Sequence, residues 1–412
     1  MAVIKPFRAI RPSKEYVDKV AELPYDVMSR DEAKNMAYNN KYSFLHIDRA
    51  EIDLPDYIDE YDEKVYLKAK ENLNKFKKEN ILIQDESECI YIYREIMDNR
   101  AQIGIVACVS VDDSLNGIIK KHEYTKPDKE LDRTNHIRYC NANTGTILIT
   151  YKNKKEIDDI INSYTKEEHL YDFISNDNIR HTVWRVSESK AINKIVDEFK
   201  SIQYLYIADG HHRAASAENI AKEMRIKNSS YTGKEEFNYY LAMIAPEKDL
   251  LVLDYNRVVK DLNNLNEIEF MNKVRENFKI INLKEDGYKP KEKGTFGMYL
   301  NNKWYKLQFK KLSEVENDTI RSLDVSILHD YLIEPILGIK NPRSDKRIEF
   351  VGGIKGIKEL ENRVNKDMRV AFSLYPTKIK ELMKVADENK IMPAKSTWFE
   401  PKVRCGLFLH EV

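Results

Sequence analysis

The sequence has little of the residues that build cross-links and flexible linkers. Its 412 residues include only four cysteines, 13 glycines and 12 prolines. The cysteines, at positions 89, 108, 140 and 405, form no CxxC pair, which argues against a zinc ribbon or a disulfide-stapled secreted domain. No stretch of Pro, Gly or Ser is long enough for a flexible linker, and no internal repeat is visible.

Long hydrophobic runs and net charge are lacking too. The longest apolar run, near residues 103–111, is far shorter than the roughly 18 to 20 residues that span a bilayer, and the amino terminus has no apolar signal segment. The 68 Lys and Arg residues balance 68 Asp and Glu residues, whereas nucleic acid or an anionic membrane normally meets a basic tract. We expect a cytoplasmic protein with reduced thiols that binds neither nucleic acid nor membrane and holds any anion locally.

What is present is enough apolar material for a core, with 42% hydrophobic and 10% aromatic residues. At about 150 residues per domain, the length predicts two to three domains. Short strand-like and helix-like patterns alternate, which predicts a mixed α/β fold with two lobes, residues 1–250 and 251–412. Runs at 89–97 and 102–111 read as an antiparallel strand pair, and Ser29 with Glu32 predicts a capped helix start. Monomer and homo-oligomer are both left open.

One strand–turn–helix segment carries the strongest functional signal. The apolar run 203–207 leads through Gly210 into an alanine-rich helix at 214–224. Glycine permits a tight turn, and the following helix points its first amides and positive dipole end at that turn. Arg213 adds a guanidinium fork suited to phosphate oxygens. The segment therefore predicts a phosphate-binding turn.

Three further polar residues share this turn. Asp209, at the end of the strand, can hold a metal ion or accept a proton, and His211 and His212 can hydrogen-bond phosphate or substrate. The alternative is a helix cap that carries two surface histidines.

A second polar tract covers residues 120–144. His122 and Glu123 could supply a general base, and Lys126 and Arg133 could neutralise phosphate. Pro127 marks the tract as a loop. A solvated loop without function explains the same residues equally well.

Two other segments could contact a substrate. Near the amino terminus, Tyr25 and Asp26 lie in a proline-marked turn, for which a helix-entry turn is the alternative. Near the carboxyl terminus, Lys395, Ser396 and Thr397 could bind a carboxylate or phosphate, for which a packed strand is the alternative.

Several motifs, in order along the whole chain, resemble one bacterial and archaeal family, domain of unknown function 1015. They are Pro6-Phe7-Arg8-Ala9-Ile10-Arg11-Pro12, Pro24-Tyr25-Asp26-Val27, Ser43-Phe44-Leu45-His46, His122-Glu123, Ala208-Asp209-Gly210-His211-His212-Arg213, Leu323-Asp324-Val325-Ser326-Ile327-Leu328-His329-Asp330, and Met392-Pro393 with Lys395-Ser396-Thr397. Tyr124 stands where an arginine is expected and Ala394 where a glutamine is common, which weakens the case for those two tracts.

The turn at 209–213 also resembles the phosphate-binding turn of the ParB and sulfiredoxin superfamily. That resemblance implies a ParB/sulfiredoxin-like nucleotide-binding core in the N-terminal lobe, with added N-terminal and C-terminal elements. It implies a nucleotide or phosphate site at Gly210, His211 and Arg213. Since His211 occupies the position of the sulfiredoxin cysteine, sulfiredoxin activity is not expected.

Together the resemblances imply a phosphotransferase that acts on a small hydroxyl metabolite, with free serine or phosphoserine favoured. They imply ATP, ADP or another phosphate donor, and Mg²⁺ on Asp209. The base would be one of Glu123, His122, Asp209 and His212, with the tract at 395–397 closing the site. The alternative is a nucleotide-sensing protein without turnover, which would not need Glu123 near Gly210.

Overall fold

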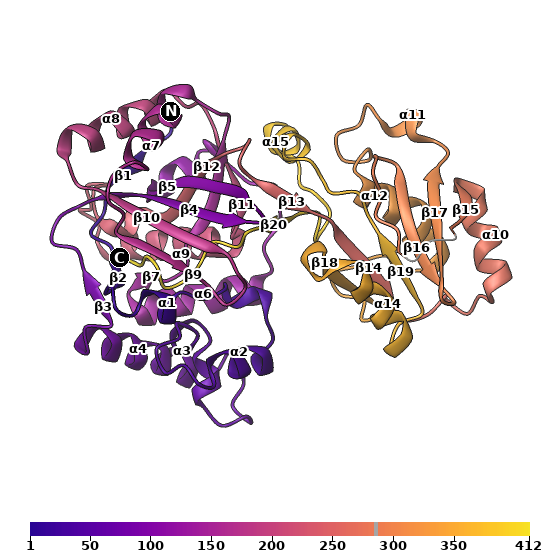
Figure 1. The fold of residues 1–412 in the computed structure, drawn as a ribbon, viewed down its shortest axis with the longest axis horizontal. Helices are drawn as coiled ribbons and strands as arrows, with labels where there is room; N and C mark the ends of the chain where they lie inside the picture. Colours follow the sequence, from indigo (N-terminus) through magenta and orange to yellow (C-terminus); the bar gives the residue numbers. More distant parts are fainter. Residues whose placement is uncertain (284–286) are drawn as a thin grey trace. The chain divides into compact units, whose positions relative to one another are not determined.

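The computed structural model describes residues 1–283 and 287–412, which form two units that interleave along the chain. The first unit comprises residues 1–121, 125–250 and 401–412, and the second comprises residues 122–124 and 251–400. The chain therefore leaves the first unit after Leu250 and returns to it at Pro401. In Figure 1 the yellow C-terminal segment runs back among indigo and magenta strands of the first unit.

A nine-stranded mixed sheet forms the centre of the first unit, in the order β6-β11-β8-β12-β5-β4-β10-β9, with β1 beside β5. The pairs β6–β11 and β8–β12 are parallel and the others antiparallel. This confirms the mixed α/β class and the expected β4–β5 pair. The strands are β1 (Ile4–Lys5), β4 (Ile90–Met97), β5 (Arg100–Ser110), β6 (Ile119–Lys120), β8 (Ile147–Tyr151), β9 (Tyr171–Ile174), β10 (Arg180–Val186), β11 (Leu205–Asp209) and β12 (Tyr239–Pro246).

One face of this sheet is aliphatic and covered by helices. Because side chains alternate along a strand, Ile90, Ile92, Ile105 and Ile149 share this face. The helices that pack on it are α5 (Val111–Leu115), α7 (Lys155–Tyr164), α8 (Ser189–Lys200) and α9 (His211–Lys227). Figure 1 shows α7 and α8 along one side of the sheet.

The opposite face is aromatic and is covered by the two ends of the chain. The ring of Tyr91 lies 5.6 Å from that of Phe7 and 5.0 Å from that of Phe408. Phe408 is fully buried, and burying such a ring contributes roughly 2 to 3 kcal/mol. The last twelve residues are therefore part of the core. Short strand pairs β2 (Ile10–Pro12) with β3 (Leu82–Gln84) and β7 (Ala142–Asn143) with β21 (His410–Glu411) hold these ends.

A helical layer at the N-terminal end packs against the C-terminal segment. Its elements are α1 (Val17–Val20), η1 (Tyr25–Val27), α2 (Arg30–Ala37), α3 (Leu45–Asp48), η2 (Ala50–Asp53) and α4 (Glu63–Lys78). Val65, Leu73 and Phe76 of α4 join a core that includes Leu409. The expected capping box is confirmed, since the Ser29 side chain accepts from the Glu32 amide and the Glu32 carboxylate accepts from the Ser29 amide.

The polar tract that the sequence assigned to a loop is largely helical, so that prediction was wrong. Helix α6 runs from Pro127 to Cys140. Proline at the first helical position does not interrupt a helix, because the amide it lacks has no partner within the helix. The inward face of α6 is polar, with Asp132, Arg133 and His136 all buried, so the apolar periodicity that marks most helices is missing.

The second unit is built around a six-stranded antiparallel sheet in the order β15-β17-β16-β19-β14-β18. These are β14 (Tyr255–Val259), β15 (Phe278–Asn282), β16 (Thr295–Leu300), β17 (Lys303–Phe309), β18 (Ile348–Gly352) and β19 (Val370–Ser373), while β13 (Leu251–Leu253) pairs with β20 (Trp398–Glu400). The helices are α10 (Glu267–Asn277), α11 (Leu312–Val315), α12 (Asp324–Leu328), the π-helical turn η4 (His329–Ile333), α13 (Glu334–Leu337), α14 (Gly356–Lys366) and α15 (Ile379–Asp387).

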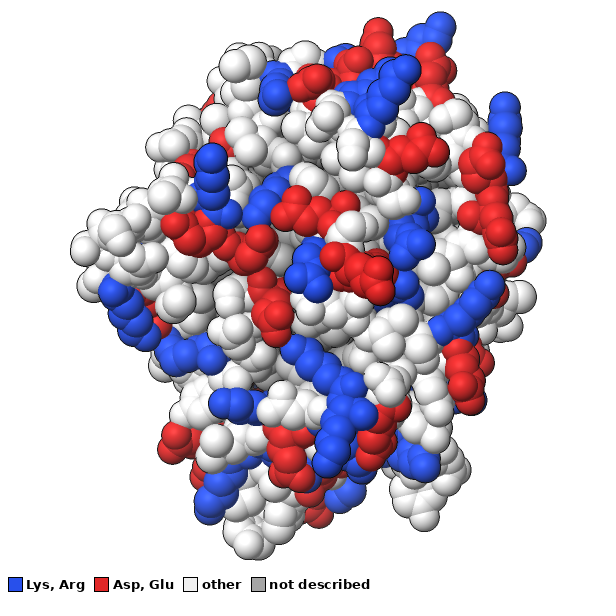
Figure 2. Space-filling model, turned by 90° about the vertical axis from the view of Figure 1, so that its left-hand side faces the viewer, with Lys and Arg blue, Asp and Glu red and all other residues white. Residues whose placement is uncertain are grey.

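Surface charge is mixed on the face that Figure 2 presents, where basic and acidic side chains are interspersed. Neither sign forms a continuous patch on this face. Among the described residues, no helix is both long enough and apolar enough to cross a bilayer.

The capping box that starts α2 gives a first test of the fold. Ser29→Ala removes the acceptor for the Glu32 amide and should lower the free energy of unfolding by about 1 kcal/mol. Glu32→Gln keeps a box-forming side chain and should change it by much less. Urea unfolding followed by circular dichroism measures both. Equal losses in the two variants would contradict this role for Ser29.

Candidate functional site

The turn between β11 and α9 depends on a glycine in a left-handed conformation. Gly210 has a φ of 97° and is the N-cap of α9. A Cβ at this position would lie 3.0 Å from Nε of Arg213, so a side chain would press on the guanidinium. Helix α9 starts at His211, directly after the turn and earlier than expected. The strand–turn–helix prediction is confirmed, whereas its ParB/sulfiredoxin-like character stays a prediction.

Arg213 is buried beneath the turn. Only 8% of its surface is exposed, and its Nη1 donates a hydrogen bond to the Thr146 carbonyl oxygen. A Cβ built on Gly145 would lie 3.0 Å from its Cδ, so Gly145 and Gly210 leave the space that the side chain fills. Burial by itself lowers the pKa of Arg213, but the carboxylates of Asp26 and Asp209 raise it above its ordinary value. Arg213 is therefore a fixed, permanently charged group.

Asp209 pairs with a lysine that sequence reasoning missed. Lys402 Nζ lies 3.0 Å from Asp209 Oδ2, and the lysine side chain is only 8% exposed. Burial opposes ionisation of Asp209, yet Lys402 and Arg213 hold its pKa well below the usual range. The carboxylate is thus charged at neutral pH. Nothing in the sequence around Lys402 marks it as a partner, since the two residues are 193 positions apart.

Arg133 and Tyr25, both predicted site residues, are in direct contact. The Arg133 guanidinium carbon lies 4.1 Å from the centre of the Tyr25 ring. Arg133 Nε donates to Asp132 Oδ2 at 2.8 Å, and its Nη1 lies 3.4 Å from Asp48 Oδ1. Burial lowers the pKa of Arg133, but Asp132 and Asp48 raise it by more. Asp26, next to Tyr25, is exposed and acts electrostatically on Arg213.

A small polar cavity lies among these groups in the first unit. Its volume is about 20 Å³, which is room for about one water molecule. It is lined by Tyr25, Asp48, Arg133, His136, Ile137, Asn143, Thr144, Gly145 and Arg213. Asp48 and Thr144 were not predicted from the sequence. The only signal that could have found the buried face of α6 is the spacing of Asp132 and His136, four residues apart.

The start of the polar tract is fixed to α9 at both of its ends. Lys121 Nζ lies 2.6 Å and 2.9 Å from the two carboxylate oxygens of Glu218. The Lys126 amide donates to His212 Nε2 at 3.0 Å. The predicted role of Lys126 rests on its ammonium group, whereas this contact uses its backbone. This hydrogen bond also occupies the lone pair on His212 Nε2. His212 would need that lone pair to accept a proton as a general base.

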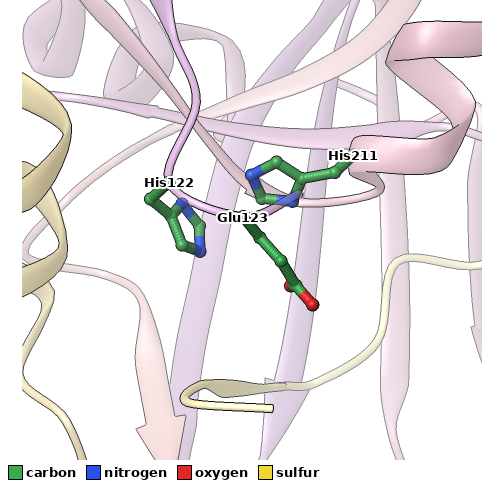
Figure 3. A group of neighbouring side chains, drawn as sticks. All are labelled: His122, Glu123 and His211. Carbon is green, nitrogen blue, oxygen red and sulfur yellow. The ribbon is translucent and has the colours of Figure 1, made fainter. Parts of the chain in front are cut away.

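The four residues between these anchors include His122 and Glu123, whose side chains approach His211 (Figure 3). One ligand atom from each of the three residues lies within 4.8 Å of the other two, as in a group able to hold a metal ion. Two imidazoles and one carboxylate suit zinc, manganese or iron(II) better than Mg²⁺, which prefers oxygen ligands. Since Lys402 already pairs with Asp209, the donor set does not favour the magnesium predicted there.

The predicted tract at 395–397 is packed within the second unit. Lys395 Nζ lies 5.5 Å from the centre of the Tyr255 ring, and the Lys395 carbonyl oxygen accepts from Arg257 Nη2 at 3.0 Å. Ser396 Oγ donates to the Pro393 carbonyl oxygen at 2.6 Å, and the Ser396 carbonyl oxygen accepts from Thr377. The predicted contribution of Lys395, Ser396 and Thr397 to substrate binding stays a prediction.

Fold and site together define a mixed α/β protein in which a buried arginine lies beneath the turn at the end of strand β11. The chain belongs to the family described as "Protein of unknown function (DUF1015)", whose profile matches residues 4–326. This confirms the family expected from the sequence motifs. No curated protein matches the chain.

Several solved structures show a distant likeness. "Free serine kinase in complex with AMP" is 14% identical with a TM-score of 0.35 and matches 71% of this chain and 86% of that chain. "SbnI with C-terminal truncation from Staphylococcus aureus" is 11% identical with a TM-score of 0.37, over 73% and 84%. A "Conserved hypothetical protein from Pyrococcus furiosus" is 13% identical with a TM-score of 0.34, over 74% and 94%. TM-scores this low do not define the activity or ligands of this chain.

The contact between Gly210 and Arg213 can be tested by adding one methyl group. Gly210→Ala places an alanine at positive φ and presses on the guanidinium. Gly117→Ala is a matched control, because Gly117 has a φ of 73° but a Cβ there would meet nothing within 4 Å. Urea unfolding should show a loss of about 1 kcal/mol for the control and a further loss of about 1 to 3 kcal/mol for Gly210→Ala. Equal losses would show that Arg213 does not press on the turn.

Buried His136 predicts a pH-dependent stability. Burial, with help from Arg133, lowers the pKa of His136 to about 4, against about 6.5 in an unfolded chain. Its contribution is therefore fully present above about pH 6.5 and is lost as the pH falls towards about 4.

In the unmodified protein, His136 should lower the free energy of unfolding by about 2 kcal/mol between pH 7 and pH 5. The His136→Gln variant should lack this part of the decrease. The remaining decrease reflects other groups such as His181. Burial, followed by the charge of Arg404, lowers the pKa of His181 to about 3. Substitution of the exposed His169 by Gln is the control. If the two variants show the same pH dependence, His136 is not the titrating group.

Proposed function

We propose that this protein is a phosphotransferase that moves a phosphoryl group between a nucleotide and a small hydroxyl metabolite, with free serine or phosphoserine as the favoured pair. The observation that carries the proposal is the turn at Gly210, where buried Arg213 and the Asp209–Lys402 pair adjoin the start of a 17-residue helix. The first amides of a helix have no acceptor within it, and they favour anions.

Phosphoryl transfer asks a protein mainly for positioning and charge neutralisation. In the proposed reaction the α9 amides and Arg213 bind phosphate oxygens. Lys402 moves from Asp209 to a phosphate oxygen or keeps Asp209 charged and in place. Arg133 supplies a further cation, held against Tyr25.

Glu123 or His122 would accept the proton of the substrate hydroxyl, or of water in the hydrolytic direction. Two features support this assignment over His212. The anchors at Lys121 and Lys126 fix the segment that carries both residues, and Glu123 lies close to His211. The Nε2 atom of His212, in contrast, already accepts a hydrogen bond.

The proposed phosphate donor is ATP, ADP or another phosphate compound. The structures named free serine kinase contain AMP or ADP, and a nucleotide at the Gly210 turn would place its phosphates at the helix amides. A divalent ion held by His211 and by one of His122 and Glu123 would neutralise phosphate charge when bound, and the other of these two residues would remain available as the base. The residues of the turn would bind and orient the phosphate independently of that ion.

The test is a phosphate-transfer assay of the full chain with serine and ATP, ADP or pyrophosphate in separate reactions, and with phosphoserine alone. Mg²⁺, Mn²⁺ and Zn²⁺ are supplied in parallel. Because Arg213 is buried and bonded to Thr146, an alanine there would disturb the fold, so Arg213→Lys is the better variant. It keeps the charge and removes the fork, and turnover should fall by about 100-fold or more.

Arg225→Ala is the matched control, because Arg225 lies on the last turn of α9 and pairs with Asp112. It should leave turnover within about twofold of the unmodified protein, because Arg225 lies at the far end of α9 from the Gly210 turn. Turnover in Arg213→Lys equal to that in Arg225→Ala would exclude this site. Tight nucleotide binding without turnover in any mixture would indicate a nucleotide sensor instead.

A further inference from the structure

The cavity in the first unit contains a carboxylate oxygen that lacks a hydrogen-bond donor. Asp48 is 3% exposed and lines the cavity. Its Oδ2 has no hydrogen-bond partner among residues 1–283 and 287–412. A buried acceptor without a partner is costly, and water or a ligand normally satisfies it.

The other oxygen of Asp48 is only weakly satisfied. Oδ1 accepts from Arg133 Nη1 at 3.4 Å and from Thr144 Oγ1 at 3.3 Å, and both distances are longer than those of good charge-assisted hydrogen bonds. His136 Nε2 lies 3.7 Å away, but the imidazole is neutral at pH 7 because burial lowers its pKa to about 4. The Cys405 thiol near Asp48 is a weak donor.

The charged groups around the cavity suit one additional positively charged donor. Arg133 bonds to Asp132, Lys402 pairs with Asp209, and Asp26 is the carboxylate with the strongest effect on Arg213. Arg133 is thus shared between Asp132 and Asp48, with the shorter contact to Asp132, so the cluster holds one carboxylate more than it holds cations. A positively charged donor beside Asp48 would balance the cluster, since buried charges are otherwise paired.

The cavity also limits the size of that donor. About 20 Å³ accommodates a group the size of one water molecule. A primary ammonium group meets this limit and provides three donors.

We propose that Asp48 receives the ammonium group of a small amine that also carries a hydroxyl group, such as an amino alcohol or a hydroxy amino acid. The ammonium group occupies the cavity, donates to Asp48 Oδ2 and to Thr144 Oγ1, and leaves the hydroxyl group directed towards the Gly210 turn. The identity of this amine as the phosphoryl acceptor rests on the proposed function, whereas its binding at Asp48 does not.

Calorimetric titration of the unmodified full chain tests the proposal with three probes, in the absence and presence of ADP. L-serine and 3-hydroxypropionate share a carboxylate and a hydroxyl group, but only serine has the ammonium group. Ethanolamine has the ammonium and hydroxyl groups without the carboxylate. Serine and ethanolamine should bind at least about tenfold more tightly than 3-hydroxypropionate, the discrimination expected for a hydrogen bond to a charged group.

Asp48→Asn keeps the shape of the side chain and removes the charge, so it should reduce this preference to about twofold or less. Asp113→Asn is the matched control, because Asp113 is also a buried carboxylate, accepts from the Val3 amide and does not line the cavity; it should retain the preference. If Asp48→Asn does not fold, the comparison of serine with 3-hydroxypropionate in the unmodified protein decides alone.

Three results would overturn the proposal: equal binding of 3-hydroxypropionate and serine, a preference that survives in Asp48→Asn, or no binding of any probe. Equal binding would show that the ammonium group makes no contribution to binding. Absence of phosphoryl transfer would contradict only the proposed function, because the titration measures binding without turnover.

Discussion

The first unit depends on the pairing of buried charges by residues that lie far apart in the sequence. A charged side chain that leaves water requires a partner of opposite sign or several hydrogen bonds. Around the Gly210 turn these requirements are met between α3, α6, β11, α9 and the C-terminal segment: Arg133 contacts Asp48, and Lys402 contacts Asp209. The positions of these elements are therefore coupled, and the cavity beneath the turn exists where their charged groups meet.

The same principle operates elsewhere in the unit. Arg11 is buried and forms hydrogen bonds to Asp85 at 2.6 to 3.1 Å, and Arg404 bonds to Asp177 beside buried His181. These clusters have internal partners for their charges, which is typical of structural networks. The cluster at Asp48 differs because one carboxylate oxygen has no donor among the described residues. That difference is the reason for proposing a ligand at Asp48 and not at the other two clusters.

Local patterns predicted local structure well. Alternating apolar residues identified β4 and β5, glycine identified the turn at Gly210, and Ser29 with Glu32 identified the start of α2. Helix α6 was missed because its inward face binds polar groups and so lacks an apolar stripe. Lys402 and Asp48 were missed for a different reason: their roles depend on which segments meet in space, and no spacing within the sequence encodes that. The family motifs located Tyr25 and Arg213, but not the contacts that give each residue its charge state.

The return of residues 401–412 to the first unit has a consequence for synthesis. On the ribosome the first 250 residues emerge before the second unit and well before the C-terminal segment. Until the end of the chain is made, Asp209 lacks Lys402, Tyr91 lacks Phe408, and one edge of the aromatic core is open to water. Contacts of such long sequence separation form late and slowly. The nascent first unit is therefore incomplete until residues 401–412 have been made, and its polar site is assembled only then.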